Sequence, residues 1–179
     1  MNIFYIDKSP IQCAQWMVDK HVVKMILESA QLLCTAHRLL DGIQTPAKSK
    51  TGRNVKRYIL EDSRDGLLYS ATHTNHPSAV WTRTSVENYL WLVEHTYGLL
   101  AEYKHRYGKT HKCTELAYYL QSPPQNLRDY DMTVMPCAMD KQYIISNDPI
   151  VNYRNYYSKG KAHIHSWTNR DPPEWIKEF

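Results

Sequence analysis

A long run of apolar residues with helical spacing, over residues 11–40, constrains the fold of this chain more than any other feature. Val22, Ile26 and Leu33 belong to the run, and residues four and seven positions apart share one face of an α-helix. Gly42 follows shortly after the run, and glycine commonly ends a helix. The spacing therefore predicts one long amphipathic helix over 11–40.

A second long helix is predicted over residues 77–107. Pro77 suits the first turn of a helix, because its ring fixes the backbone angle and its missing N–H needs no partner there. Trp81 and Leu92 mark the side that we expect to be buried, and Gly108 is the expected stop. Shorter helices are predicted over residues 112–120 and 149–158.

The size and composition of the chain fit a globular protein. It has 179 residues, of which 42% are hydrophobic and 22% are charged, so it can bury a sufficient core without disulfides. Its four cysteines form no C-x-x-C pair, and reduced thiols are the simplest interpretation. We therefore expect a mainly α fold over residues 1–179: a compact, single-domain helical bundle with two long helices and an irregular C-terminal wrap.

The N-terminal residues MNIFYIDKSP lack the basic and long apolar stretches of a secretory signal. Elsewhere, no stretch approaches ~18 consecutive apolar residues. We expect a cytoplasmic protein with no membrane partner. Residues 2–6 are predicted to form a short strand or an extended arm.

Residues 43–57 contain five basic residues and no acidic one, together with Pro46 and Gly52. This composition predicts an exposed loop. The loop is either a solvated connector or a phosphate-contacting segment, in which case Arg53, Lys56 and Arg57 would bind nucleic acid. The net charge of +4 is compatible with a polyanionic partner.

One face of the first predicted helix carries ionisable side chains: Lys20, His21, Lys24 and Glu28. Residues at these spacings share a stripe. A carboxylate beside histidine and lysine can serve in acid–base catalysis, because its surroundings can tune its protonation. The alternative is an ordinary solvated helix face.

His73 and His76 lie three residues apart, immediately before the second long helix. A zinc site needs three or four convergent ligands, and no zinc-binding motif is present. We therefore expect no metal or other cofactor, although a histidine-based metal-dependent hydrolase that also uses His21 is kept as an alternative. His76, directly before Pro77, could instead meet a phosphate at the mouth of the helix.

The C-terminal segment 149–179 alternates basic and aromatic residues. Basic side chains can contact phosphates while rings stack on unpaired bases; alternatively, the tyrosines pack on the core. The candidate nucleic-acid-binding residues of this segment are Tyr153, Arg154, Tyr157, Lys159 and Lys161.

Three segments in the same order resemble known phage proteins. They are Asp19-Lys20-His21 with Glu28 seven residues after the histidine, Asn75-His76-Pro77 opening a long helix, and the aromatic-basic stretch 153–162. The chain resembles a group of proteins from tailed bacteriophages, particularly those of cyanobacteria. More remotely, it is similar to the small phage pyrimidine-dimer DNA glycosylases.

This second resemblance implies a compact helical protein that binds duplex DNA, flips a base out of the helix and cuts its glycosidic bond. In that family the N-terminal amine attacks the sugar carbon and forms a Schiff base, with help from a glutamate that corresponds to Glu28. The family exposes a threonine amine, whereas residue 2 here is asparagine. The amine of Met1, Lys20 or Lys24 could then be the nucleophile, or there could be none.

The expected function is therefore a DNA glycosylase-like enzyme, with or without lyase activity, that acts on damaged or modified bases through an amine and Glu28, with His21 nearby. A non-catalytic nucleic-acid-binding phage accessory protein is the alternative from a different class. Under both hypotheses we expect duplex DNA to be the partner, in the cytoplasm of an infected host cell.

Overall fold

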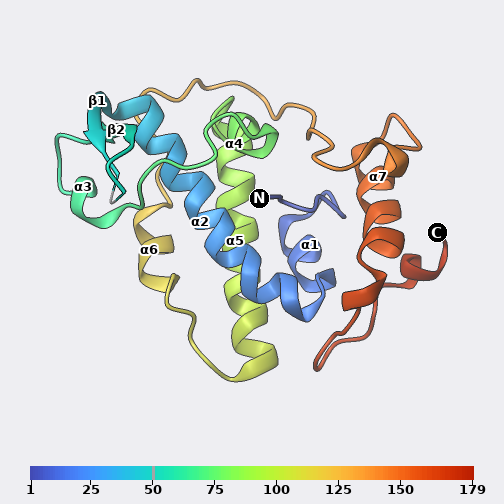
Figure 1. The fold of residues 1–179 in the computed structure, drawn as a ribbon. Coiled ribbons are helices and arrows are strands. Elements are labelled where there is room, and N and C mark those ends of the chain that lie inside the picture. Colours follow the sequence, from blue (N-terminus) through green and yellow to red (C-terminus); the bar gives the residue numbers. More distant parts are fainter. Residues whose placement is uncertain (50) are drawn as a thin grey trace.

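Two long helices cross at the centre of the molecule and pack against each other (Figure 1). They are α2 (Asp19–Asp41) and α5 (Val86–Tyr107). The computed structural model describes residues 1–49 and 51–179. Helices predominate in this part of the chain, so the prediction of a mainly α fold is confirmed.

Two shorter helices complete the central layer. Helix α1 (Pro10–Trp16) packs along α5, and α4 (Pro77–Thr82) packs against α2. The close approach of α1 to α5 depends on Gly98, because a Cβ atom there would lie 2.9 Å from the Cβ of Ala14. A side chain at this position would push the two helices apart.

The predicted helix over 11–40 is broken, so this part of the prediction is wrong. Met17 and Val18 have extended backbone angles, with ψ of 142° and 155°, and they separate α1 from α2. Both side chains are fully buried. The N–H of Val18 is a donor to the hydroxyl of Tyr157 at 2.9 Å, and this contact replaces part of the hydrogen bonding that a continuous helix would supply.

The predicted helix over 77–107 is also broken, which is a second correction. Ser85 is extended, and its side chain accepts a hydrogen bond from the N–H of Asn88 at 3.2 Å. This is an N-cap, and it starts α5 as a separate helix after α4. Because both long predicted helices are interrupted, the description as a bundle of two long helices is only partly confirmed. Helix α5 ends as predicted, at Gly108 with φ of 64°.

The predicted basic loop 43–57 is a β-hairpin instead. Strand β1 (Ile43–Lys48) pairs antiparallel with β2 (Asn54–Ile59), and Pro46 lies opposite Lys56. Gly52, with φ of 80°, lies in the turn. Lys50 of the predicted loop lies outside the described residues. The short helix α3 (Arg64–Leu67) follows at the base of the hairpin.

The second half of the chain is less regular. After α5 the chain forms α6 (Thr114–Tyr119), and a long segment then passes over the top of the molecule in Figure 1 to α7 (Pro149–Asn155) on the right, at the opposite end from the hairpin. The remaining elements are the 3₁₀ turn η1 (Lys141–Tyr143), the π-turn η2 (Tyr156–Gly160) and the 3₁₀ turns η3 (Ala162–Ile164) and η4 (Glu174–Lys177).

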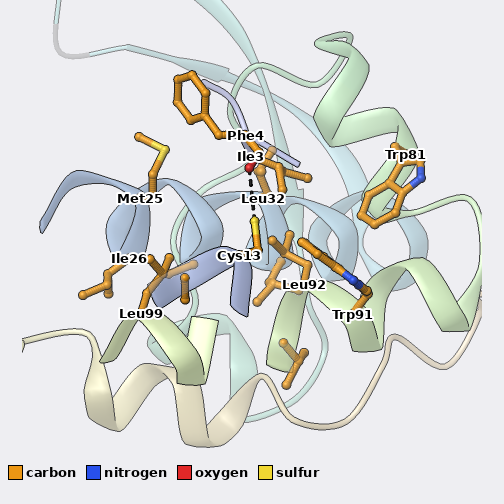
Figure 2. Packing of buried hydrophobic residues seen from close by; sticks show 14 of the residues in the cluster. Ile3, Phe4, Cys13, Met25, Ile26, Leu32, Trp81, Trp91, Leu92 and Leu99 are labelled. Carbon is orange, nitrogen blue, oxygen red and sulfur yellow. Dashed lines mark hydrogen bonds between the residues drawn. The ribbon is translucent and has the colours of Figure 1, made fainter. Parts of the chain in front are cut away.

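The core combines side chains from distant parts of the sequence (Figure 2). Ile3 and Phe4 of the N-terminal arm meet Cys13 of α1, Ile26 of α2 and Leu92 of α5 in one cluster of buried residues. The arm is therefore an integral part of the core, and burial of its apolar side chains holds it in place.

No helix in the described residues is long and apolar enough to cross a membrane.

Candidate active site

The N-terminal arm brings the amino group of the chain to the middle of α2. The Met1 nitrogen lies 3.9 Å from Oε2 of Glu28, whose side chain is 12% exposed. The Asn2 backbone N–H donates to the same oxygen at 3.1 Å. Lys24, one helical turn before Glu28, places its Nζ 3.2 Å from the other oxygen. A primary amine and a nearly buried carboxylate thus share one site.

The side chain of Asn2 fixes the arm in this position. Its Oδ1 accepts hydrogen bonds from the backbone N–H of Ile3 at 2.8 Å and of Phe4 at 3.1 Å. Its Nδ2 donates to the carbonyl of Ala138 at 2.8 Å. Such a local loop is a typical use of asparagine. The three bonds tie the first turn of the arm both to itself and to the 133–138 segment.

Phe4 adopts a backbone conformation that is rare for an aromatic residue, with φ of 57°. The surroundings hold it there: its carbonyl accepts from the N–H of Ile6 at 2.8 Å and from the thiol of Cys13 at 3.2 Å (Figure 2). Its ring stacks on the His21 imidazole, with 4.2 Å between ring centres. Strain of this kind persists where neighbours over-determine it, and it is concentrated at functional sites.

His21 faces the arm rather than the Glu28 carboxylate. Its Nδ1 lies 2.9 Å from the hydroxyl of Tyr157, which also accepts a bond from the Val18 N–H. The Tyr157 hydroxyl therefore donates its proton to Nδ1 of His21, and Nε2 carries the ring proton of the imidazole. Burial, reinforced by the charges of Lys161 and Lys24, lowers the pKa of His21 to about 3. The imidazole is neutral at physiological pH and packs against Phe4.

His76 lies close enough to the amine for the charge of the amine to affect it. Its Nδ1 accepts a hydrogen bond from the N–H of Ser78 at 3.2 Å and so caps α4. Burial lowers the pKa of His76, and the positive Met1 amine lowers it further, while Glu28 opposes this shift. The segment before His76 is held against α2, because the Thr35 hydroxyl accepts from the N–H of Thr72 at 3.1 Å.

Lys161 borders the same face near His21. Its Nζ lies 5.0 Å from the ring centre of Tyr156 and 5.8 Å from that of Phe4, within the range of cation–π attraction. The π-turn η2 brings Tyr156 here and requires Gly160, because a Cβ at Gly160 would lie 2.6 Å from the Tyr156 ring. Lys20 is exposed on the first turn of α2.

No family model, curated protein or solved structure matches the chain. An amine with a free lone pair attacks an electrophilic carbon such as that of an aldehyde or a sugar acetal, and a neighbouring carboxylate can take up the proton that the nitrogen loses. Schiff-base chemistry is what this arrangement of Met1 and Glu28 fits best.

Among the predicted site residues, the structure brings together Met1, Lys24 and Glu28, and the charge of the amine also reaches His76. His21 and Lys161 lie next to this group, across the Phe4 ring. The hairpin residues Arg53, Lys56 and Arg57 lie elsewhere, at one end of the molecule (Figure 1).

Three of the predicted nucleic-acid contacts in the C-terminal segment have internal partners instead. Tyr153 and Tyr157 are fully buried, so their rings cannot stack on a base in this conformation. The Arg154 Nε donates to the carbonyl of Ile6 at 2.9 Å, and its guanidinium lies 5.2 Å from the ring centres of both Trp16 and Trp175. Arg154 thus fastens α7 to the N-terminal arm, whereas the Tyr153 hydroxyl donates to the carbonyl of Pro136 at 2.8 Å. Lys159 is exposed.

Within the described residues, no three His, Cys, Asp or Glu side chains are placed to hold a metal ion. His73, His76 and His21 are therefore not arranged as a ligand set.

Sequence reasoning missed Asn2, Phe4 and Ala138 as parts of the site. By its sequence, Asn2 stands out only as a departure from the threonine of the phage glycosylases. The ability of an asparagine side chain to bond the following backbone N–H groups is a signal that could identify it. The carbonyl of Ala138 carries no sequence signal, because any residue supplies one.

Proposed function

We propose that this chain is a DNA glycosylase-like enzyme that uses the Met1 amine and Glu28 on damaged or modified bases. The observation that carries the proposal is the 3.9 Å separation between the Met1 nitrogen and Oε2 of Glu28. Flexible, exposed lysines carry amines in most proteins. Here, by contrast, the fold holds an amine on a buried arm beside a nearly buried carboxylate. Lyase activity at the resulting site belongs to the same proposal.

The proposed chemistry begins with the neutral amine. Its lone pair forms a bond to C1′ of the sugar, while the C1′–N glycosidic bond breaks and its electron pair leaves with the base, which is protonated by water. The nitrogen gives a proton to the Glu28 carboxylate. The nitrogen lone pair then forms a C1′=N bond as the C1′–O4′ bond breaks, O4′ takes the proton held by Glu28, and a protonated imine remains. Loss of a proton from C2′ would break the C3′–O3′ bond and release the 3′ phosphate, which is the lyase step.

Charge around the site supports an anionic substrate. The Met1 amine, Lys24 and Lys161 lie on this face, and Lys20 is exposed one turn away along α2. Glu28 is the acidic group in direct contact with the amine. Excess positive charge beside a nucleophile suits the phosphates that flank a nucleotide.

The proposal agrees with the resemblance to the phage pyrimidine-dimer glycosylases, whose glutamate corresponds to Glu28. The proposed enzyme is a single-domain helical bundle around two long helices with an irregular C-terminal wrap. It acts on duplex DNA in the cytoplasm of an infected host cell. The buried Phe4, Asn2 and His21 would supply the rigid support that a catalytic amine needs.

The direct test is borohydride trapping with a duplex that contains one abasic site. The abasic aldehyde and the amine lose water to form an imine, and borohydride reduces it to a stable amine that joins protein and DNA. The wild-type chain, prepared with a free Met1, should give the adduct. Glu28→Gln should reduce the trapping rate by about 10²-fold or more, since general acid–base catalysis contributes ~10²–10⁴-fold. Glu94→Gln, on the exposed side of α5, is the matched control.

A chain extended by Gly-Ser before Met1 should also lose the adduct, whereas the same extension after Phe179 should not. Duplexes with a panel of damaged bases then identify the substrate. Absence of an adduct with the abasic duplex, in a chain that folds normally, would remove the catalytic proposal.

One observation favours the non-catalytic alternative, a nucleic-acid-binding accessory protein. The basic side chains of the hairpin form no ion pair with an acidic residue among the described residues. Their binding to nucleic acid would not require the Met1 amine or Glu28. If trapping fails while salt-dependent duplex binding persists with Glu28→Gln, this second function is the one to keep.

A further inference from the structure

The hairpin β1–β2 projects from the helical body. Every residue of both strands is exposed or half-buried, so neither strand contributes to the core. A two-stranded hairpin without a buried face is marginally stable by itself. Contacts at its base hold it: the Arg38 guanidinium donates to the carbonyl of Tyr58 at 3.0 Å, and Asp65 Oδ1 accepts from the N–H of Leu60 at 2.9 Å.

The hairpin is strongly basic and is not neutralised by its own molecule. Lys48, Arg53, Lys56 and Arg57 form no ion pair within the part of the chain that the structure describes, and the sequence has no acidic residue over 43–60. Arginines of the body behave differently, because several of them are paired with carboxylates: Arg38, Arg64, Arg106, Arg154 and Arg170. The hairpin thus presents positive charge that no acidic residue of its own strands balances.

The strand register sorts these side chains by face. Cross-strand partners point to the same side of a sheet. Lys48 lies opposite Asn54, and Gln44 lies opposite Tyr58, so Gln44, Lys48, Asn54 and Lys56 share one exposed face. Lysine, asparagine and glutamine are the side chains that bond phosphates and base edges in the major groove, and that groove admits a two-stranded ribbon.

We infer that the hairpin is a groove-binding arm for double-stranded nucleic acid, and that it contacts the duplex beside the nucleotide held at the amine site. The partner class rests on the proposed function, but the arm itself rests on its projection, its unpaired charge and its polar face. The arm supplies affinity and register, while the amine and Glu28 supply chemistry.

The path from the arm to the amine site is short. A cleft of about 230 Å³ between hairpin and body is lined by Lys56, Arg57, Ser70 and Ala71. His76 lies five positions after Ala71, so the Cα atoms of these two residues lie at most about 18 Å apart. This distance corresponds to roughly five base pairs along a duplex, at ~3.4 Å per step. One duplex can therefore reach both places.

The test compares two variants that remove the same charge. Lys48→Gln with Lys56→Gln alters the exposed face of the arm, and Lys104→Gln with Lys109→Gln alters exposed lysines at the far end of α5. Binding to an abasic duplex is measured over a range of salt concentrations. The slope of log Kd against log salt should fall by about 0.9 per lost phosphate contact for the arm variant, and it should stay near wild type for the control. Both variants should keep the wild-type melting temperature.

Three results would overturn the inference. The first is an equal change of slope in both variants, which would indicate only a diffuse charge effect. The second is an equal loss of affinity for single-stranded DNA of the same length, because a groove arm requires a duplex. The third is arm-dependent binding to phosphatidylserine vesicles without duplex binding, which would assign the arm to a lipid surface.

Trapping separates this inference from the proposed function. If no adduct forms in any protein but duplex binding still depends on the arm, the proposed function fails and the arm stands. If trapping succeeds and the arm variant binds normally, the arm fails and the function stands.

Discussion

Asn2 is the residue on which the position of the amine depends most. Its side chain uses all three of its hydrogen bonds to shape the first turn of the arm and to hold it against Ala138. Its backbone N–H also reaches Glu28. Asn2, which stands where the phage glycosylases have threonine, is thus a positioning residue for the amine.

We predict that Asn2→Leu, which removes the three bonds at similar volume, slows covalent trapping at saturating duplex by roughly 10²-fold, because a displacement of about 1 Å costs this much. Asn2→Asp keeps the acceptor for Ile3 and Phe4 but loses the donor to Ala138, so its loss should be smaller. Duplex affinity should change little in both variants. Mass spectrometry must confirm that Met1 is retained. Trapping at the wild-type rate in both variants would show that the turn is not needed.

At the scale of elements, the sequence predicts where helices occur but not where they break. The apolar spacing continues through Met17 and Val18, and the cause of the break is the hydroxyl of Tyr157, which lies 139 residues further along the chain than Val18. The hairpin escapes prediction because its strands lack the alternation of apolar and polar residues that marks a half-buried strand.

The sequence also predicts only part of the candidate active site. Glu28 and Lys24 follow from helical spacing, and His76 follows from its place before Pro77. The meeting of the arm with α2 depends on contacts between distant segments, which no local pattern records.

The packing of α1 on α5 gives a prediction at this scale. Gly98→Ala places a Cβ 2.9 Å from the Cβ of Ala14 and 3.2 Å from Cδ1 of Ile11. Overpacking of this kind should reduce the free energy of unfolding by about 1–3 kcal/mol. Gly66→Ala is the matched control, since a Cβ there meets nothing within 4 Å. Urea denaturation measures both, and equal stability of the two variants would contradict the close helix contact.

At the scale of the whole molecule, buried neutral histidines couple stability to pH. Burial lowers the pKa of His21 to about 3 and that of His95 to about 4. Burial and the charge of Arg64 lower the pKa of His37 to about 4. In the unfolded chain each imidazole takes up a proton near pH ~6.5. Acidification below this value therefore favours the unfolded state until the folded pKa is reached.

We predict that the free energy of unfolding changes little between about pH 7 and 8 and falls as the pH drops from about 6.5 to 4, by up to ~1.4 kcal/mol per pH unit for each histidine. His95→Gln should reduce the slope by up to that amount, at some cost in stability near neutral pH. Denaturation in urea at several pH values measures the slope. A free energy that stays flat from pH ~7 to ~5 would contradict this account of the buried histidines.

The claim that most needs a direct measurement is the identity of the nucleophile. After borohydride trapping on the abasic duplex, nuclease and protease digestion followed by mass spectrometry locates the nitrogen that carries the reduced sugar. We predict attachment at the α-nitrogen of Met1, 3.9 Å from Glu28. Attachment at Lys20 or Lys24, or an adduct spread over several lysines, would contradict it.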